Sequence, residues 1–311
     1  MIKFLFLSKK KIKFLLLLFI VCFSFSYGFV VSLKKIFPYD IIIKTYYSIT
    51  SITKNEDIKP EPKKLTSCNI NKIDIIPPGS RVFIGHAYGS PEYPKNYEEF
   101  INDKVFSFIQ ENANLLDSII FTGDIFDIPS KKKWDKLYNF TKGVKIYITP
   151  GNHDILRPDS REAFERSKFG IIEYPYYIKS NFTDLILEDS ISTNWNTSKK
   201  TINYLKNNDK NRFIIARHNV PIKELLSYVN SQAGMGDNLE TFNALKKHIG
   251  DGDFTWIIGD TGAFPNLPRL KCLKNNNFRF ILNGVGDLIG DSIIVEIEGK
   301  LYEHTLERYN Y

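Results

Sequence analysis

Short apolar runs rich in β-branched and aromatic residues alternate along this chain with stretches in which apolar residues recur at helical spacing. In the first half, strands are expected at 81–85, 118–122 and 144–148, with helices between them at 97–116 and around Trp134. Alternation of strands and helices favours parallel strands joined by crossover helices. The sequence therefore predicts an α/β fold, whose usual ligand site lies at the carboxyl ends of the strands.

The second half continues the pattern with a larger share of strand. Further strands are expected at 184–188, 213–217, 254–259, 278–283 and 292–297. Two further helices are expected at 198–206 and 240–249.

The N-terminus carries a different signal, because residues 14–33 are twenty consecutive residues without a charge. A helix of that length spans the ~30 Å hydrocarbon core of a bilayer. Five lysines precede the segment, and this excess favours a single-pass anchor with a cytoplasmic N-terminus and an extracytoplasmic body. The alternative is a cleaved signal peptide with an apolar core at 14–23 and a cleavage site at 24–26, but the apolar run continues beyond that site.

The predicted organisation is a membrane anchor at 1–35, a juxtamembrane linker at 36–77 and a folded domain at 78–311. Prolines and mixed charges around residues 59–64 suit an extended spacer. The formal net charge of +7 comes from seven lysines within the first 35 residues, which leaves 35 basic and 35 acidic residues in the body. A neutral body lacks the basic surface that nucleic-acid binding requires, so no nucleic-acid partner is expected.

The three cysteines constrain the chemistry only weakly. Cys22 lies in the apolar segment, and Cys68 and Cys272 could either form a disulfide in an oxidising compartment or stay unpaired. No Cys-x-x-Cys motif occurs, which argues against a zinc site built from thiolates.

Polar residues of metal-binding type follow several of the predicted strands. They are His86, Asp124, Asn152, His153, His218 and Asp260. The carboxyl ends of parallel strands meet at one edge of a sheet, so these side chains can share a cleft. Imidazole, carboxylate and amide oxygen together suit a divalent cation such as Mn, Fe or Zn.

Two motifs among these residues resemble a known family. Residues 123–127, Gly-Asp-Ile-Phe-Asp, resemble the G-D-x-x-D motif of calcineurin-like metallophosphoesterases, and residues 151–154, Gly-Asn-His-Asp, resemble their G-N-H-[DE] motif. His218 is similar to the isolated histidine that follows a later strand in that family. The resemblance covers about 78–297 and implies a layered α-β-β-α sandwich.

Two other family motifs are altered in this chain. The opening D-x-H is represented by His86-Ala87-Tyr88, and the closing G-H-x-H by residues 259–262, Gly-Asp-Thr-Gly. By position, the resemblance implies one firm metal site made of Asp124, Asn152, His218 and Asp260. The second site keeps His86 and a shared Asp124, with Tyr88 beside them, and is expected to be weak or absent.

The resemblance also implies hydrolysis of a phosphate ester of unspecified class. In that case His153 would stabilise the transition state or protonate the leaving oxygen, and Asp154 would hold its ring in orientation. Arg157 and Arg217 are the arginines expected to meet the phosphate. A structural interpretation stays open for Asp127 and Asp154, which could cap helices, and the alternative function is a catalytically inactive binding or assembly factor at the membrane.

Overall fold

The computed structural model describes residues 23, 24, 26–28, 65–89, 100–170, 173–208, 212–229, 242, 252–262, 267–286 and 289–309. The chain divides into two compact units, Met1–Asp57 and Ile58–Tyr311. In the first unit, residues 23, 24 and 26–28 are helical, and the rings of Phe23 and Tyr27 stack with centroids 6.4 Å apart. Most of the predicted anchor and the linker up to residue 64 lie outside the described residues. No helix within the described ranges is both long and apolar enough to cross a bilayer.

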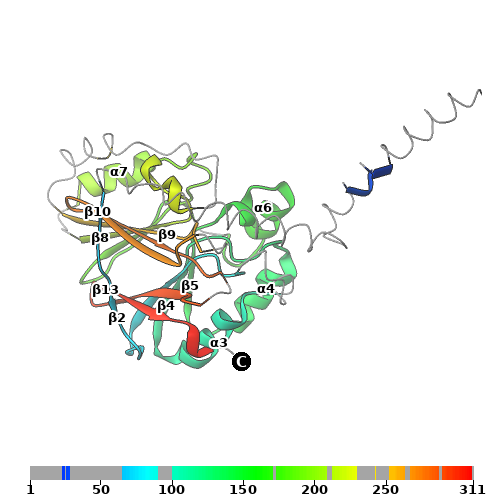
Figure 1. Ribbon diagram of the computed structural model, residues 1–311, viewed down its shortest axis with the longest axis horizontal. Coiled ribbons are helices and arrows are strands. Elements are labelled where there is room, and N and C mark those ends of the chain that lie inside the picture. Colours follow the sequence, from blue (N-terminus) through cyan, green and yellow to red (C-terminus); the bar gives the residue numbers. More distant parts are fainter. Residues whose placement is uncertain are drawn as a thin grey trace, which may run out of the picture. The chain divides into compact units, whose positions relative to one another are not determined.

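The second unit contains two mixed sheets (Figure 1). The six-stranded sheet has, in spatial order, the strands β2 (Asn71–Lys72), β13 (Lys300–Thr305), β12 (Ser292–Ile297), β3 (Ser80–Ile84), β4 (Leu116–Phe121) and β5 (Lys145–Ile148). Within it, β3, β4 and β5 are parallel, as the alternation of strands and helices predicted.

The seven-stranded sheet has, in spatial order, the strands β1 (Thr66–Ser67), β10 (Leu270–Asn275), β11 (Phe278–Asn283), β9 (Asp253–Ile258), β8 (Arg212–Arg217), β7 (Asp184–Leu187) and β6 (Tyr176–Ile178). Its four central strands, β11, β9, β8 and β7, are parallel, and the outer strands run antiparallel. Both sheets therefore present the carbonyl ends of parallel strands to loops.

Three helices of this unit begin where the sequence provides a capping side chain. The described helices are α3 (Asp103–Asn112), α4 (Lys131–Phe140), α5 (Asn152–Ile155), α6 (Pro158–Glu165) and α7 (Lys199–Lys206). The side chains of Asn102, Ser130 and Ser198 accept backbone N–H bonds at the starts of α3, α4 and α7. The helix expected at 97–116 is shorter because Asn102 caps it and because residues 113–115 tighten into a 3-10 turn.

Three apolar clusters fill the layers of this unit. The first lies between the sheets, where Phe83, Ile120, Leu187, Ile214 and Ile257 pack together. The second packs residues of α3, α4 and α6 against the six-stranded sheet, and the third packs residues of α7 against the seven-stranded sheet (Figure 1). Because the central strands β3, β4, β8 and β9 alternate their side chains between two clusters, the middle of each sheet is buried on both faces.

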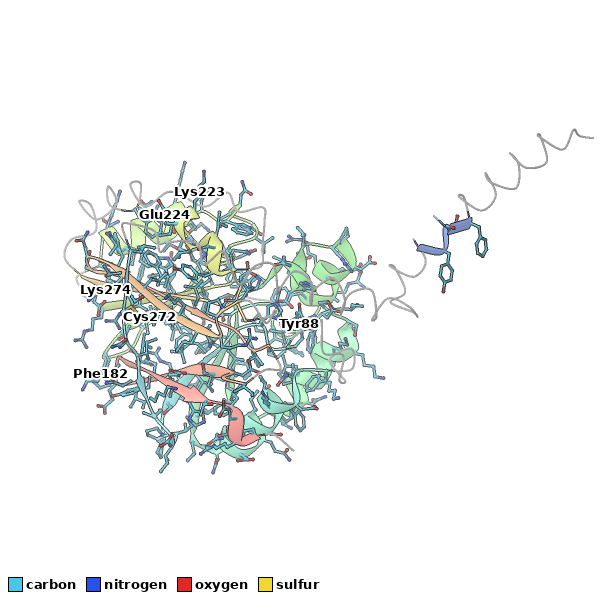
Figure 2. All side chains as sticks on the ribbon, in the orientation of Figure 1. Tyr88, Phe182, Lys223, Glu224, Cys272 and Lys274 are labelled. Atoms are coloured by element: carbon cyan, nitrogen blue, oxygen red, sulfur yellow. A yellow bond between two sulfur atoms is a disulfide. The ribbon has the colours of Figure 1, made fainter. Side chains whose placement is uncertain are left out.

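The domain begins earlier than the predicted boundary at residue 78. Strands β1 and β2 fall within the stretch expected to be linker, and they pair with β10 and β13. Cys68 follows β1 and forms a disulfide with Cys272 of β10 across a sequence separation of 204 (Figure 2). The disulfide settles the alternative that the sequence left open for these two cysteines. The helix expected at 240–249 lies outside the described residues, apart from Phe242.

Candidate metal centre and active site

The predicted ligands converge at the edge where parallel strands of both sheets end. His86 follows β3, Asp124 follows β4, Asn152 follows β5, His218 follows β8 and Asp260 follows β9. Nε2 of His218 lies 3.1 Å from Oδ1 of Asn152 and 3.3 Å from Oδ2 of Asp124. The same Oδ2 lies 3.5 Å from Nε2 of His86, so the Asp124 carboxylate stands between the two rings. Oδ1 of Asp260 is more distant, at 3.9 Å from Nε2 of His218.

Two glycines allow this close approach. A Cβ on Gly123 would come within 2.4 Å of the His218 ring, and a Cβ on Gly151 would come within 2.2 Å of the Asp124 carboxylate. The following residue Asp124 itself has a φ of 54°, and His86 has a φ of 53°. Positive φ is costly for residues other than glycine and is found most often where a functional site requires it. Glycine is thus a steric requirement at both motif positions.

The hydrogen bonds fix the tautomer of all three histidines. Nδ1 of His86, His153 and His218 lies 2.9, 2.8 and 3.0 Å from the carbonyl oxygens of Gly89, Asp127 and Thr122, in that order. A carbonyl oxygen only accepts, so each Nδ1 carries a hydrogen and donates it. In the neutral ring the lone pair is then on Nε2, which is the arrangement of metal-binding histidines with a hydrogen-bonded outer nitrogen.

The carboxylates divide into two kinds. Asp124 accepts a bond from the His153 N–H with Oδ1, and Asp260 accepts one from Nδ2 of Asn219 with Oδ2, so each keeps its other oxygen toward the centre. Asp154 differs, because Gly151 N and Asp124 N donate to one of its oxygens and Ile125 N to the other. We conclude that Asp154 joins two loops through their backbones.

The expectation that Asp154 orients the His153 ring is therefore corrected. Asp127 does so instead, through its carbonyl oxygen and through Oδ1, which lies 3.4 Å from Nδ1 of His153. The sequence offered only helix capping for Asp127, because the contact joins loops that follow different strands. Asn219 was also missed, since its neighbour His218 carried the recognisable signal.

A cation fits the centre. With Nδ1 of His218 protonated, its Nε2 lone pair faces the oxygens of Asn152 and Asp124 at 3.1 and 3.3 Å, and buried acceptors that face one another require a proton or a cation between them. Ligands about 2.1 Å from a metal lie roughly 3.0–3.4 Å apart, which matches these separations. Within the described ranges, no three His, Cys, Asp or Glu side chains stand in a preformed metal-binding arrangement. The fit thus depends on the Asn152 amide and on a small approach of Asp260.

The electrostatics reflect this crowding of charges. Burial lowers the pKa of His86 to about 4. Burial also lowers the pKa of His218, but the neighbouring charge of Asp124 and then Asp260 outweigh it and raise the pKa to about 10. His153 follows the same balance, with Asp124 and Asp127 raising its pKa to about 9. Burial raises the pKa of Asp260 to about 6, and burial together with the Asp124 charge raises that of Asp154 to about 7.

Comparison with known proteins agrees with the motifs. Residues 94–246 match the sequence model of the family described as calcineurin-like phosphoesterase. The matched residues include Asp124, Asn152, His153 and His218, so this part of the chain is similar to that family. Proteins of this family generally use divalent metals. Among curated proteins, no sequence matches this chain.

Two crystal structures are among those that this chain resembles, both at low identity. One is a conserved uncharacterised protein of Streptococcus pneumoniae TIGR4, described as a predicted phosphoesterase, with 9% identity and a TM-score of 0.31 over 70% of this chain and 81% of that one. The other is the 5'-nucleotidase of Candida albicans SC5314, with 10% identity and a TM-score of 0.36 over 73% of this chain. This chain covers 49% of the nucleotidase, about half its length.

In the two altered family motifs, Tyr88 and Gly262 stand where the family pattern has ligands. The ring of Tyr88 packs against His86 with centroids 4.3 Å apart and against His153 at 5.3 Å, so it contacts the rings of two predicted site residues. Gly262 carries no ligand atom and has a φ of 83°. A Cβ there would meet the carbonyl oxygen of Gly284 at 2.1 Å, so the backbone leaves no space for the histidine of the family pattern.

The two arginines expected to bind phosphate have different positions. Arg217 is fully buried, and it donates to Glu188 at 2.8 Å, to the Asn219 carbonyl at 2.8 Å and to the Trp195 carbonyl. A guanidinium bonded in this way cannot reach a substrate, which corrects the prediction and makes Arg217 a residue that fixes the loop after β8. Arg157 is exposed at the start of α6, and its role in substrate binding stays a prediction.

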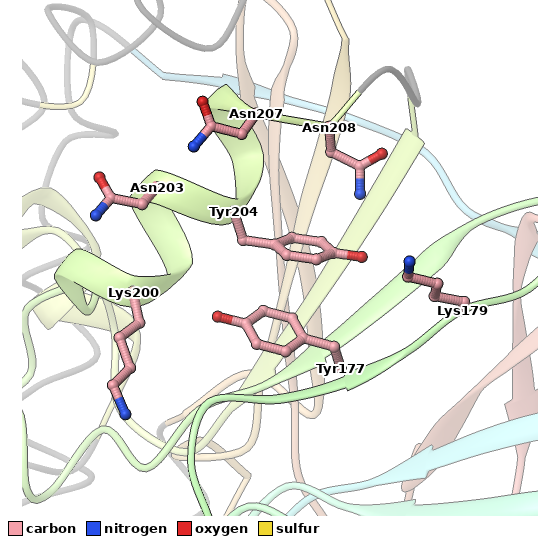
Figure 3. A pocket seen from close by; sticks show the side chains of 7 residues that line it. All are labelled: Tyr177, Lys179, Lys200, Asn203, Tyr204, Asn207 and Asn208. Atoms are coloured by element: carbon pink, nitrogen blue, oxygen red, sulfur yellow. The ribbon is translucent and has the colours of Figure 1, made fainter.

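A separate open cavity of about 690 Å³ lies over β6 and α7 (Figure 3). Tyr177 and Tyr204 stack in it with centroids 4.2 Å apart, and lysines and asparagines surround them. None of the predicted site residues lines this cavity. The chemistry of the side chains, rather than the size of the hollow, therefore identifies the candidate active site.

Proposed function

We propose that this chain hydrolyses a phosphate ester with the help of a divalent metal held by Asp124, Asn152, His218 and Asp260. One observation carries the proposal, namely that Nε2 of His218 faces the oxygens of Asn152 and Asp124 in a buried centre at 3.1 and 3.3 Å. A bound Mn, Fe or Zn ion would polarise a phosphoryl oxygen and lower the pKa of a water molecule toward about 7.

His153 is the residue proposed to act on the leaving group. Its Nδ1 hydrogen is committed to Asp127, and its ring is half-buried beside Asp124. Nε2 is therefore the nitrogen that meets substrate, where it stabilises charge on the phosphoryl group or gives a proton to the leaving oxygen. Asp127 keeps the ring in place, and Arg157 at the rim is proposed to contact the phosphate.

The test uses the full chain purified in a mild detergent, with Mn²⁺ and a panel of phosphomonoester, phosphodiester and pyrophosphate substrates. His153→Asn retains a donor at the position of Nδ1 while it removes Nε2. We expect this variant to lose about 10²–10⁴-fold in turnover and to bind metal as before. Absence of hydrolysis across the panel would count against the proposal, and an unchanged rate in His153→Asn would remove that residue from the mechanism.

We further propose that the enzyme is anchored through residues 14–33 and works outside the cytoplasm. Support comes from the uncharged segment, from the lysines that precede it and from the disulfide between Cys68 and Cys272, since disulfides persist mainly in oxidising compartments. Protease added to sealed membrane vesicles that expose their cytoplasmic side tests this orientation: the domain should stay intact until detergent is added, whereas a cytoplasmic domain would be cut at once.

A second function is favoured by one specific observation, the replacement of two family ligands by Tyr88 and Gly262. If the centre can no longer support hydrolysis, the chain would be an inactive binding or assembly factor of the same fold. The two functions differ in metal content and rate. A chain that binds metal and hydrolyses a phosphate ester is the divergent enzyme, and a chain that does neither is the binding factor.

A further inference from the structure

Asn219 forms a polar support behind Asp260 in the proposed centre. Its backbone N–H donates to the Ser190 hydroxyl at 3.0 Å, and that hydroxyl donates to Oδ1 of Asn219 at 3.2 Å. The oxygen of the amide is thus engaged, so the remaining Nδ2 must face Asp260, whose Oδ2 it approaches at 3.1 Å. Ser190, Asn219 and Asp260 are all buried. Because buried polar groups need hydrogen-bond partners, the bond from Ser190 fixes the orientation of the Asn219 amide, and the amide in turn fixes the Asp260 carboxylate.

This support determines what Asp260 can offer to a cation. With Oδ2 held by Asn219, only Oδ1 is directed toward His218, at 3.9 Å from its Nε2. The donor atoms on this side are then three oxygens, from Asp124, Asn152 and Asp260, and one nitrogen, from His218. In the family pattern a histidine stands where this chain has Asp260, so the exchange replaces one nitrogen donor with a charged oxygen.

The donor set has a consequence for the choice of metal. Carboxylate and carbonyl-type oxygens suit hard cations such as Mn²⁺ and Mg²⁺, whereas imidazole suits Zn²⁺ and Fe²⁺. Two carboxylates also balance the charge of a divalent ion. We propose that this centre is an oxygen-rich site for a hard divalent cation of the Mn²⁺ type, and that Asn219 is the positioning residue that sets this preference by directing Asp260. The inference rests on the metal site of the proposed function and names its cation.

The experiment measures metal binding without substrate, so that its result is separate from hydrolysis. The full chain in mild detergent is stripped with a chelator and titrated with Mn²⁺ while the electron paramagnetic resonance signal of free Mn²⁺ is followed. Zn²⁺ competition then gives the ratio of the two affinities. Asp260→His restores the nitrogen donor, and Asp253→His adds the same ring at the exposed opposite end of β9 as a matched control.

We expect Asp260→His to shift the affinity ratio toward Zn²⁺ by about tenfold or more, and Asp253→His to leave it unchanged. Asn219→Leu should weaken Mn²⁺ binding about 10–100-fold and move the ratio in the same direction. Ser190→Ala, which only loosens the amide, should give a smaller shift of the same sign. Thermal unfolding of each variant without metal separates these effects from loss of fold.

Two results would overturn the inference. One is an affinity ratio that does not differ between the wild type and Asp260→His, and the other is Mn²⁺ binding that is unaffected by Asn219→Leu. Hydrolysis supported by Zn²⁺ or Fe²⁺ in the same preparations would then leave the proposed function intact. Conversely, selective Mn²⁺ binding without hydrolysis of any ester would support the inference and count against the proposed function.

Discussion

The two sides of the Asp124 carboxylate differ in what they can hold. On the side of His218, the acceptors of Asn152 and Asp124 lie within 3.3 Å of one nitrogen, and Asn219 supports Asp260 from behind. On the side of His86, the neighbouring ring is that of Tyr88, at 4.3 Å between centroids. The difference teaches that the two histidines beside one carboxylate have unequal sets of neighbours, and that the set around His218 is the richer in donor atoms for a cation.

The largest expected effect separates the two sides directly. His218→Asn and His86→Asn each keep a donor for the backbone carbonyl that holds Nδ1 and remove the Nε2 ligand. We expect His218→Asn to lower metal affinity by at least about 100-fold and to abolish hydrolysis, whereas His86→Asn should cost less than about tenfold. Isothermal titration with Mn²⁺ and rate measurements check both. Equal losses in the two variants would mean that both sides hold metal.

The next effect concerns the ring that both sides adjoin. Asp127→Asn leaves the carbonyl bond to His153 and removes only the charge near Nδ1, so turnover should fall by roughly 10–100-fold without a change in metal affinity. Asp154→Asn serves as the contrast. Its bonds are to backbone N–H groups, and we expect it to lower the free energy of unfolding by about 1.5–3 kcal/mol. A fall in Mn²⁺ affinity in Asp127→Asn would contradict this assignment of roles.

The gain in the free energy of unfolding on metal binding provides a third test of whether the side of His218 holds a cation. Because a cation relieves acceptors that face one another in the folded state, Mn²⁺ at 100 times its Kd should raise the free energy of unfolding by about 2.7 kcal/mol. Denaturant unfolding with and without Mn²⁺ measures this gain. Asp260→Ala should reduce the gain at a fixed Mn²⁺ concentration, and Asp253→Ala should not. The idea fails if Mn²⁺ leaves the wild type as stable as before.

The smallest expected effect is that of His304, which lies on neither side of Asp124. Its contribution to the pH dependence of stability can be measured separately from that of the centre. His304 is buried, its Nδ1 lies 3.0 Å from the Ile73 carbonyl, and burial lowers its pKa below the usual 6.5. Folding therefore favours the neutral ring, and the stability that this provides is complete above pH 6.5 and is lost as the pH falls toward the lowered pKa. His304→Asn should lose less stability than the wild type between pH 7 and 5, by under about 1 kcal/mol. Parallel pH profiles would show that His304 does not contribute.

The strands that sequence alone predicted are those with an apolar run between turn residues. The runs expected at 278–283 and 292–297 coincide with β11 and β12, since each contains three consecutive apolar residues, 280–282 and 293–295, and turn residues flank them. Strands β10 and β13 were missed because charged and polar residues interrupt their apolar pattern and because they are stabilised by pairing with a neighbour. The motifs correctly predicted the resemblance to the calcineurin-like phosphoesterase family, and the alternation of elements correctly predicted α/β sheets.

The site shows where this reasoning stops. Parallel strand ends allowed the meeting of Asp124, Asn152 and His218 to be expected, and the structure brings them together. Asp127 bonds to His153, 26 residues away in sequence, and Asn219 bonds to Asp260, 41 residues away. A local sequence pattern does not predict contacts over such separations. Arg217 was placed at the substrate for the same reason, because its buried partner Glu188 is 29 residues away.

The disulfide between Cys68 and Cys272 also determines how the domain would respond to a pull on the chain that precedes it. Strand β1 is only two residues long, and by itself it would peel away from β10 under tension. The covalent bond transfers that load to the hairpin of β10 and β11, whose six residue pairs resist it together. A tether at the N-terminus could therefore be strained without disturbing the edge of the sheets where the metal ligands meet.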